Sequence, residues 1–328
     1  MLRILSITAQ FLEDVLLAIV LLWSLGLLVY QPVCIIPVAV LAAAAVAVWL
    51  WRSGKARSVR GWLWGCFLVC ACAYLLLPNP RGPWQTPWAR TPHCTLDGNI
   101  LTIQDLRDFR YTTVDDYETR YTTQTYDLST LVGADFAECR WDGHEAICHT
   151  MMSFAFADGR HIVFSAETRV PVGDEQNAVG GLYKRYGLAC LIGTEEDIFA
   201  LRTNYRHEDL YIYPLLTTPQ QTLTLLLGML EFANNANEQG AHYNTVTANC
   251  SAPYIALLRR AVPDLPKRSI LLPIYNSAIA EIFYNRGFLL KHGENETLPA
   301  RRERAKVGYD IPLQNYSQNL RQRLVGED

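Results

Sequence analysis

Residues 149–169 have the sequence HTMMSFAFADGRHIVFSAETR, in which two runs of β-forming side chains are separated by Ala157-Asp158-Gly159. A three-residue loop with glycine in the left-handed conformation is a common hairpin connection. Such a loop pairs residue 156 with residue 160. This register sets Met152 opposite Phe164 and gathers the apolar side chains on one face. The segment therefore predicts an antiparallel hairpin.

The loop length also decides which polar residues face each other. A two-residue loop would leave Phe156 facing His161 and would bury the apolar residues less consistently. The three-residue loop instead sets His149 directly opposite Glu167. A carboxylate across from an imidazole can fix its tautomer and stabilise the imidazolium. The favoured register thus predicts an oriented histidine.

A second segment supplies a candidate nucleophile. Residues 243–251 (YNTVTANCS) are polar and run into residues 252–260 (APYIALLRR), which have helical spacing. Asn249 is a natural N-cap, and Pro253 is tolerated in the first turn of a helix. Cys250 is therefore predicted at the positive end of a helix, where the thiolate is favoured. A low-pKa thiol beside an oriented histidine is the arrangement of a cysteine nucleophile.

Each of these features also has an ordinary explanation. A strand histidine is more often a surface or core residue, Glu167 could simply pair with Arg169, and Cys250 could be half of a disulfide. The cysteines outside the apolar runs are Cys94, Cys139, Cys148, Cys190 and Cys250. An odd number in an oxidising compartment leaves one thiol unpaired, and this favours a Cys/His site.

The cysteines around residue 144 admit two other interpretations. Cys139 and Cys148 flank a turn-forming sequence and could close a hairpin through a disulfide. His144-Glu-Ala-Ile-Cys-His149 is one residue too long for the zinc-peptidase motif, so its second histidine leaves the ligand face of a helix. A zinc site made by Cys139, Cys148 and His144 stays a weaker alternative. We expect no metal and no cofactor.

The distribution of apolar residues excludes a purely cytosolic globular protein. No charged residue occurs between Val15 and Trp51, or between Gly61 and Pro80. A membrane span needs about 20 mainly apolar residues. The pattern predicts three transmembrane helices at about 9–30, 33–51 and 61–77. The alternative of a cleaved signal peptide lacks a small-residue cleavage site and leaves two spans unexplained.

Charge sets the expected topology. Residues 52–60 form a short loop with four positive charges, which predicts a cytoplasmic loop and an extracytoplasmic remainder. Of the 29 Lys and Arg and 32 Asp and Glu in the chain, residues 1–77 hold five and two. The remainder is therefore acidic, with 24 basic and 30 acidic side chains. An acidic domain without a basic stripe argues against nucleic acid as a partner.

The remainder is predicted to be an α+β domain. Residues 99–111, 146–156 and 160–169 have the composition of strands, and residues 219–237, 250–261 and 275–286 have helical spacing. We divide the chain into a three-helix membrane region (1–77), a catalytic domain (78–290) and a polar, weakly ordered C-terminal tail (291–328).

The order of motifs resembles the Lnb N-terminal periplasmic domain family of bacterial envelope proteins, over roughly residues 84–289. The matching segments are Arg107–Tyr111, His149 with Ser153–Gly159, Ser165–Arg169, Gly181–Tyr186, Glu195–Asp197, Leu201–Thr203, Tyr211–Leu215 and Tyr243–Cys250. The resemblance implies an antiparallel sheet packed on helices in a circularly permuted papain-like fold, which is why His149 precedes Cys250 in the chain. It also implies a multi-pass protein of the bacterial inner membrane with its catalytic domain in the periplasm.

The resemblance further implies site roles and a reaction. Cys250 would be the nucleophile, His149 the base and Glu167 the orienting group. Further residues in or next to these motifs are expected to bind substrate or support the site: Asn249, Arg169, Tyr243, Asn244 and Arg107.

The family includes a lipoprotein N-acyltransferase, so we expect an acyltransferase with a cysteine thioester intermediate and a phospholipid donor. Membrane lipids and lipoproteins are the expected partners. The lipoprotein acyltransferase carries its membrane helices after the catalytic domain, whereas here they precede it. The acceptor therefore stays open between a lipoprotein α-amine, another amine-bearing lipid and water. Two alternatives are a papain-like amidase or peptidase acting on peptidoglycan or envelope peptides, and a non-enzymatic binding domain with Cys250 in a disulfide.

Overall fold

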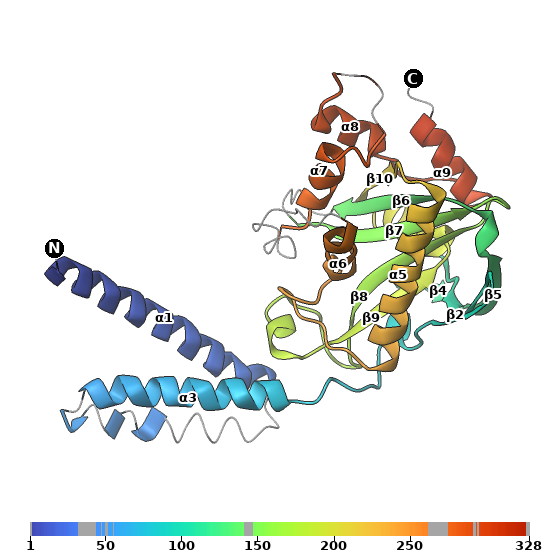
Figure 1. Cartoon of the computed structure of the whole chain (residues 1–328). Helices are drawn as coiled ribbons and strands as arrows, with labels where there is room; N and C mark the ends of the chain where they lie inside the picture. Colours follow the sequence, from blue (N-terminus) through green and yellow to red (C-terminus); the bar gives the residue numbers. More distant parts are fainter. Residues whose placement is uncertain are drawn as a thin grey trace. The chain divides into compact units, whose positions relative to one another are not determined.

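The computed structural model describes residues 2–31, 44–46, 48–49, 52–54, 56–140, 147–261, 275–290, 293 and 295–325 (Figure 1). The chain forms two compact units, each described by itself. The first comprises Met1–Asn79 and Asn177–Arg185, and the second comprises Pro80–Gln176 and Tyr186–Asp328. The short segment Asn177–Arg185, expected in the catalytic domain, thus groups with the N-terminal helices.

The first unit contains helices α1 (Leu2–Tyr30) and α3 (Ala56–Leu76). Within α1, residues Gln10–Leu27 are long and apolar enough to cross a membrane, whereas the apolar stretch of α3, Gly61–Leu76, is shorter. The structure therefore supports one of the three predicted spans by length and composition. The predicted helix at 33–51 lies almost entirely outside the described residues.

The returning segment Asn177–Arg185 packs tightly on helix α1. The Tyr183 ring stacks on Tyr30 with 5.1 Å between ring centroids, and the Gln31 amide donates a hydrogen bond to the Tyr183 carbonyl at 2.7 Å. Gly26 permits this approach, since a Cβ at this position would lie 2.0 Å from the Tyr183 hydroxyl. Aromatic stacking and close backbone packing thus hold this unit together.

The second unit is built on a sheet with the strand order β1-β2-β9-β8-β7-β6-β10, and β5 pairs with β2. The pairs are antiparallel except for a single parallel bridge between β2 and β9. The strands are β1 (His93–Asp97), β2 (Ile100–Arg107), β5 (Tyr121–Asp127), β6 (Leu131–Arg140), β7 (His149–Phe156), β8 (His161–Arg169), β9 (Gly187–Gly193) and β10 (Asp209–Pro214), and a separate pair is β3 (Arg110–Tyr111) with β4 (Tyr117–Glu118).

The hairpin of β7 and β8 has the predicted three-residue loop and register. The Phe156 N–H donates to the Arg160 carbonyl at 3.0 Å, and Gly159 has a φ of 85°. Met152 lies opposite Phe164. Glycine suits this loop because positive φ costs it no steric strain. The hairpin prediction is confirmed.

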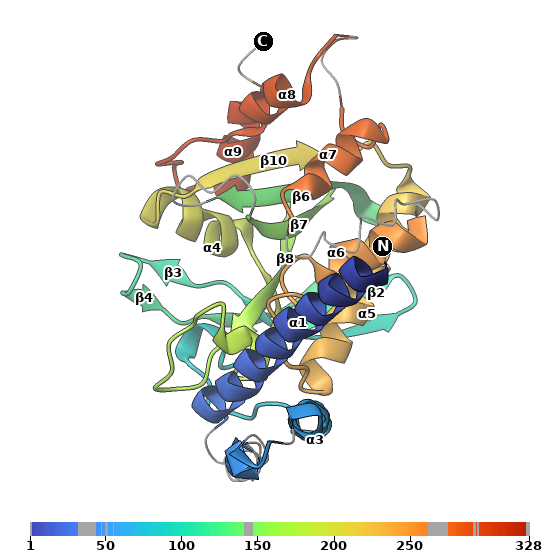
Figure 2. The ribbon, with the colours of Figure 1, turned by 90° about the vertical axis from the view of Figure 1, so that its left-hand side faces the viewer.

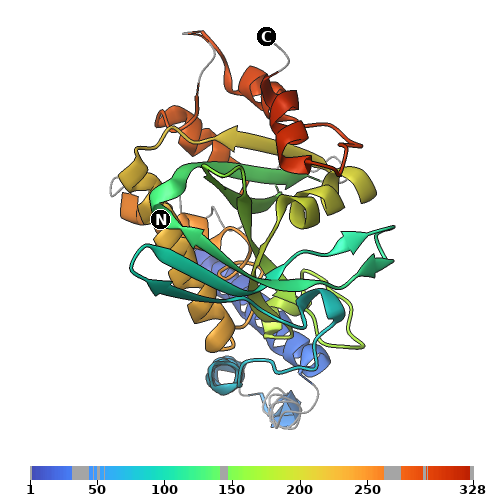
Figure 3. The same ribbon diagram turned by 90° about the vertical axis from the view of Figure 1, so that its right-hand side faces the viewer.

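Helices cover both faces of the sheet (Figures 2 and 3). The helices α5 (Pro219–Glu238), α6 (Ala252–Ala261) and α7 (Ala278–Asn285) pack on one face, where the core includes Phe154 and Phe164. The helices α4 (Glu195–Ala200) and α9 (Tyr316–Val325) pack on the other, against Met151 and Val163. Side chains of a strand alternate between faces, so each strand serves both layers. The mixed α+β class and the three predicted helices of this domain are confirmed.

The C-terminal segment differs from the expectation of weak order. It contains α8 (Leu298–Ala305) and α9, and it belongs to the second unit. Arg321 of α9 forms ion pairs with the buried Glu195 at 2.6 Å and with Asp135 at 2.7 Å. The segment is polar in composition, yet its apolar side chains Val307, Ile311, Tyr316 and Leu320 are buried in the core. Apolar packing and these ion pairs together order it.

Candidate active site

The loop before α6 fixes the position of Cys250. The Asn244 side-chain oxygen accepts hydrogen bonds from the backbone N–H groups of Val246 and Thr247, both at 3.0 Å. The Asn249 side-chain oxygen accepts from the Ser251 N–H at 3.1 Å and from its hydroxyl at 2.7 Å. Asn249 thus caps the turn that leads into α6. Cys250 lies two residues before the first residue of that helix, as the sequence predicts.

His149 is the first residue of β7, and its ring faces β8. The Nε2 atom lies 2.7 Å from the Ser165 hydroxyl oxygen and 3.2 Å from Glu167 Oε1. The Ser165 hydroxyl donates its own hydrogen to Glu167 at 2.6 Å, so its oxygen accepts from His149 Nε2. The Nε2–H therefore donates to β8. This leaves Nδ1 as the ring nitrogen for the hydrogen bond with Cys250.

Glu167 is held ionised by Ser165, Arg202 and His149. In addition to Ser165, Arg202 donates to Glu167 Oε1 at 3.1 Å, and the Arg202 guanidinium is itself buried and bonded to the Ile198 carbonyl. Burial opposes ionisation, but the charge and hydrogen bond of His149 and the charge of Arg202 keep the pKa of Glu167 well below its usual range. A permanent carboxylate can orient the imidazole and stabilise its charged form.

The pKa values of the cysteine and the histidine move toward each other. Burial raises the pKa of the Cys250 thiol, but the hydrogen bond and charge of His149 outweigh it and leave this pKa below its ordinary value. Burial favours neutral His149, but the charge of Glu167 and the hydrogen bond with Cys250 raise the pKa of His149 to about 9. The arrangement favours a thiolate beside an imidazolium.

Polar groups also surround the sulfur on its other sides. The backbone and the side chain of Thr150 both lower the pKa of Cys250. The Thr150 hydroxyl is buried and has no hydrogen-bond partner of good geometry within the described residues. The Asn276 amide nitrogen lies 3.6 Å from the Cys250 sulfur and donates to the Cys148 carbonyl at 2.5 Å. These donors can stabilise negative charge next to the sulfur.

The predicted supporting residues divide into two groups. Tyr243 is held by a hydrogen bond from its backbone N–H to the Tyr186 carbonyl at 2.9 Å, and burial and the charge of Cys250 raise the pKa of its hydroxyl to about 12. Asn249 and Asn244 shape the loop that carries Cys250. Arg169 instead donates to the carbonyls of Trp88 and Ala89, and Arg107 forms a buried bidentate pair with Asp197. Both arginines support neighbouring segments, and within the described part of the chain neither forms a hydrogen bond with the sulfur or the imidazole.

The suggested Cys139–Cys148 disulfide is not formed. The described cysteines, including Cys250, are free. Cys139 lies opposite His149 in the strand pairing, and its thiol donates to Glu208 at 2.9 Å. His144, a ligand of the zinc alternative, is outside the described residues. An unbridged Cys250 is a requirement of the nucleophile hypothesis.

Sequence reasoning missed Ser165, Arg202, Thr150 and Asn276 as site residues. Ser165 stands two residues before Glu167 on the same strand face, and this spacing could have indicated it. Asn276 precedes a helix distant in sequence, and its position beside the sulfur depends on how α7 packs. No local pattern points to it.

Comparison with known proteins identifies one relationship. A family model described as the Lnb N-terminal periplasmic domain matches residues 117–281. This range contains His149, Glu167, Cys250 and Asn276 and leaves out Arg107. No curated protein and no solved structure matches the chain.

Proposed function

The chain belongs to the Lnb N-terminal periplasmic domain family, and we propose that it is a cysteine-dependent acyltransferase. The family is described by a periplasmic domain, and the segment Gln10–Leu27 of α1 is long and apolar enough to cross a membrane. Together they indicate a membrane-anchored protein with a periplasmic domain. The observation that carries the proposal is the line of contacts from Glu167 through His149 to Cys250. The order of His149 before Cys250 is that of permuted papain-like enzymes, the fold we propose.

In the first half of the reaction, His149 Nδ1 takes the proton of the Cys250 thiol. The thiolate attacks the carbonyl carbon of a phospholipid ester, a C–S bond forms, and the ester C–O bond breaks. The imidazolium gives its proton to the departing lysolipid oxygen. Thr150 and the Asn276 amide stabilise the transient oxyanion, because both act on the sulfur as hydrogen-bond donors.

In the second half, a neutral amine attacks the thioester carbonyl. A C–N bond forms, the C–S bond breaks, and His149 takes the proton that the amine loses. This returns the thiolate and imidazolium pair. An amine at the N-terminus of a lipoprotein is the acceptor we favour, and Glu167 keeps the imidazole oriented through both halves.

The test is to trap the acyl-enzyme. Full-length protein is incubated with phospholipid carrying a labelled acyl chain and without amine, and the label on Cys250 is read by mass spectrometry. We expect a thioester that hydroxylamine releases, and none in Cys250→Ala. Labelling that persists in Cys250→Ala contradicts the proposal.

The same experiment separates transfer from hydrolysis. An added amine acceptor should take up the label if the enzyme is a transferase, whereas release of free fatty acid at an unchanged rate indicates a lipid hydrolase. Labelling by activated envelope peptides in place of lipid would indicate the amidase or peptidase.

A further inference from the structure

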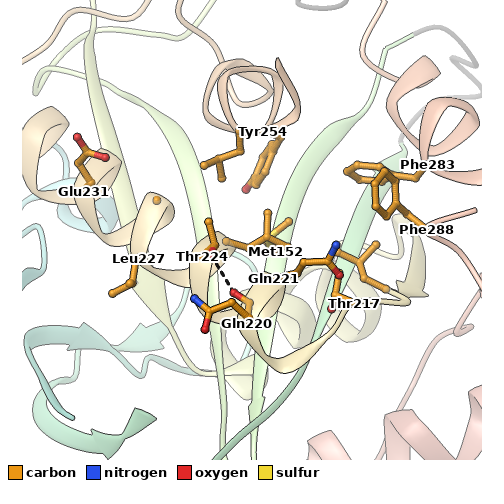
Figure 4. Close-up of a pocket in the computed structure, with 14 residues that line it drawn as sticks. Met152, Thr217, Gln220, Gln221, Thr224, Leu227, Glu231, Tyr254, Phe283 and Phe288 are labelled. Carbon is orange, nitrogen blue, oxygen red and sulfur yellow. Dashed lines mark hydrogen bonds between the residues drawn. The ribbon is translucent and has the colours of Figure 1, made fainter. Parts of the chain in front are cut away.

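An apolar pocket of about 560 Å³ lies in the second unit between β7 and the helices α5, α6 and α7. Met152 comes from β7, Tyr254 and Leu257 from α6, and Phe283 from α7. Figure 4 shows Tyr254 and Met152 extending toward each other across the pocket, with Phe283 and Phe288 at one end. A volume of this size is typical of small-molecule sites, which cover roughly 300–1,000 Å³.

Two elements that line the pocket, β7 and α6, also lead to the site around Cys250. Tyr254 stands in the first turn of α6 and follows Cys250 by four residues. Its hydroxyl donates to the Phe164 carbonyl at 3.1 Å, and burial, followed by the charges of Cys190 and Cys250, raises its pKa. Thr150, which contacts the sulfur, and Met152 are alternate residues of β7 and share one face. The pocket thus shares strand β7 and the chain around the start of α6 with the site that holds the nucleophile.

The polarity of the pocket is graded. Tyr254, Met152 and Phe283 are buried, while polar residues of α5 such as Gln220, Gln221 and Thr224 are exposed along its edge. Figure 4 shows these α5 side chains together on one side. A ligand that fits has a long apolar part and a polar end that stays near water.

We propose that this pocket binds one straight acyl chain of the donor lipid and keeps it after the thioester on Cys250 has formed. The inference rests on the proposed function and specifies the ligand, a long-chain acyl group. The pocket is lined by residues of β7 and α6, which adjoin His149 and Cys250 in the chain, has apolar walls from three helices and a strand, and has a polar edge. Because the ester carbonyl stays at Cys250, the chain is the part of the lipid that enters the pocket.

The first measurement reports binding without turnover. Full-length Cys250→Ala is placed in nanodiscs of phosphatidylethanolamine and phosphatidylglycerol containing a phospholipid with a diazirine on its acyl chain. After irradiation, we expect crosslinks in peptides that cover 219–238, 252–261 and 283–288. Crosslinks confined to α1 and α3 would overturn the proposal.

The second measurement uses a variant that fills the pocket. Thr224 is exposed and lines the pocket, so Thr224→Trp narrows it without disturbing the core. We expect at least fivefold less crosslinking in these peptides. Gln322→Trp places the same side chain at an exposed position of α9 outside the pocket and should leave crosslinking unchanged. Equal losses in both variants, or a loss in neither, contradict the proposal.

Chain length supplies an independent readout in protein with Cys250 intact. Each methylene that the pocket buries should tighten apparent donor binding about fourfold until the pocket is full. Thr224→Trp should shift this limit to shorter chains. Cys250 labelling with no chain-length preference and no pocket crosslinks overturns the pocket and leaves the acyltransferase standing. Pocket crosslinks without a Cys250 thioester would support the pocket as an acyl-chain site and would contradict the acyltransferase.

Discussion

The charges of Glu167, His149 and Cys250 depend on one another. Arg202 and Ser165 keep Glu167 ionised, Glu167 keeps the His149 ring positive, and the ring favours the Cys250 thiolate. Removing any member should weaken the others, because each is held by the charge of the next.

The substitution Glu167→Gln tests this coupling. Glu167 raises the pKa of His149 to about 9, so at neutral pH the imidazolium is present and it is lost as the pH rises through about 9. In Glu167→Gln this loss should begin at lower pH, and Cys250 acylation should slow by about 10²-fold, with a smaller effect on lipid binding. The measurement is the pH profile of single-turnover acylation.

The matched control is Glu238→Gln, since Glu238 is an exposed carboxylate paired with His93. It should keep both the rate and the profile of the unmodified protein. If the fall in acylation rate at high pH occurs at the same pH in Glu167→Gln as in the unmodified protein, Glu167 does not set the pKa of His149.

The site residues differ in how far sequence could predict them. Cys250, His149 and Glu167 were accessible because a capped helix start and a hairpin register are local patterns. Asn276 was not, because its contact with the sulfur requires α7 to pack beside the start of β7. Arg107 and Arg169 stand in motifs that match the family, yet both bind neighbouring segments. A motif shows that a residue matters without showing whether its role is chemical.

At the scale of elements, the β7–β8 hairpin carries two of the three reacting groups. Its loop therefore governs the distance between His149 and Glu167. A slip of one residue would place the two side chains on opposite faces of the sheet.

Gly159→Val tests the loop. A Cβ at Gly159 meets nothing within 4 Å, so the cost is the strain of a β-branched residue at a φ of 85°. We expect the free energy of unfolding to fall by about 1–3 kcal/mol, seen as a lower melting temperature of the full-length protein. Gly133→Ala, in β6 and also without close neighbours, should have little effect. Equal effects would contradict the strain argument.

Hairpins and amphipathic helices could be predicted, but the centre of the sheet could not. Strand β9 is buried along its whole length, so its sequence Gly187–Gly193 is a short apolar run without alternation. Such a run fits a buried strand or a buried helix equally well. Strand β10 and the short α4 could not be predicted either. Their neighbours in space are distant in sequence.

At the scale of the whole molecule, the C-terminal segment is part of the second unit, which carries the candidate active site. Its composition is polar, and this indicated a tail. The structure instead uses Arg321 to neutralise two carboxylates, of which Glu195 is fully buried. Composition alone could not reveal this, because it does not distinguish a charged residue that is buried and paired from one that is exposed to solvent.

Arg321→Ala should therefore destabilise the second unit. Glu195 also accepts a hydrogen bond from Ser153, in the middle of β7, at 2.7 Å. Without Arg321 it would be left as a buried charge beside Asp135, which typically costs about 3 kcal/mol. The melting temperature of the full-length protein should fall by several degrees, and Cys250 acylation should be lost on heating before that of the unmodified protein. Gln322→Ala, the exposed neighbour on α9, should change neither. If Arg321→Ala melts like Gln322→Ala, the ion pairs of Arg321 do not stabilise the fold.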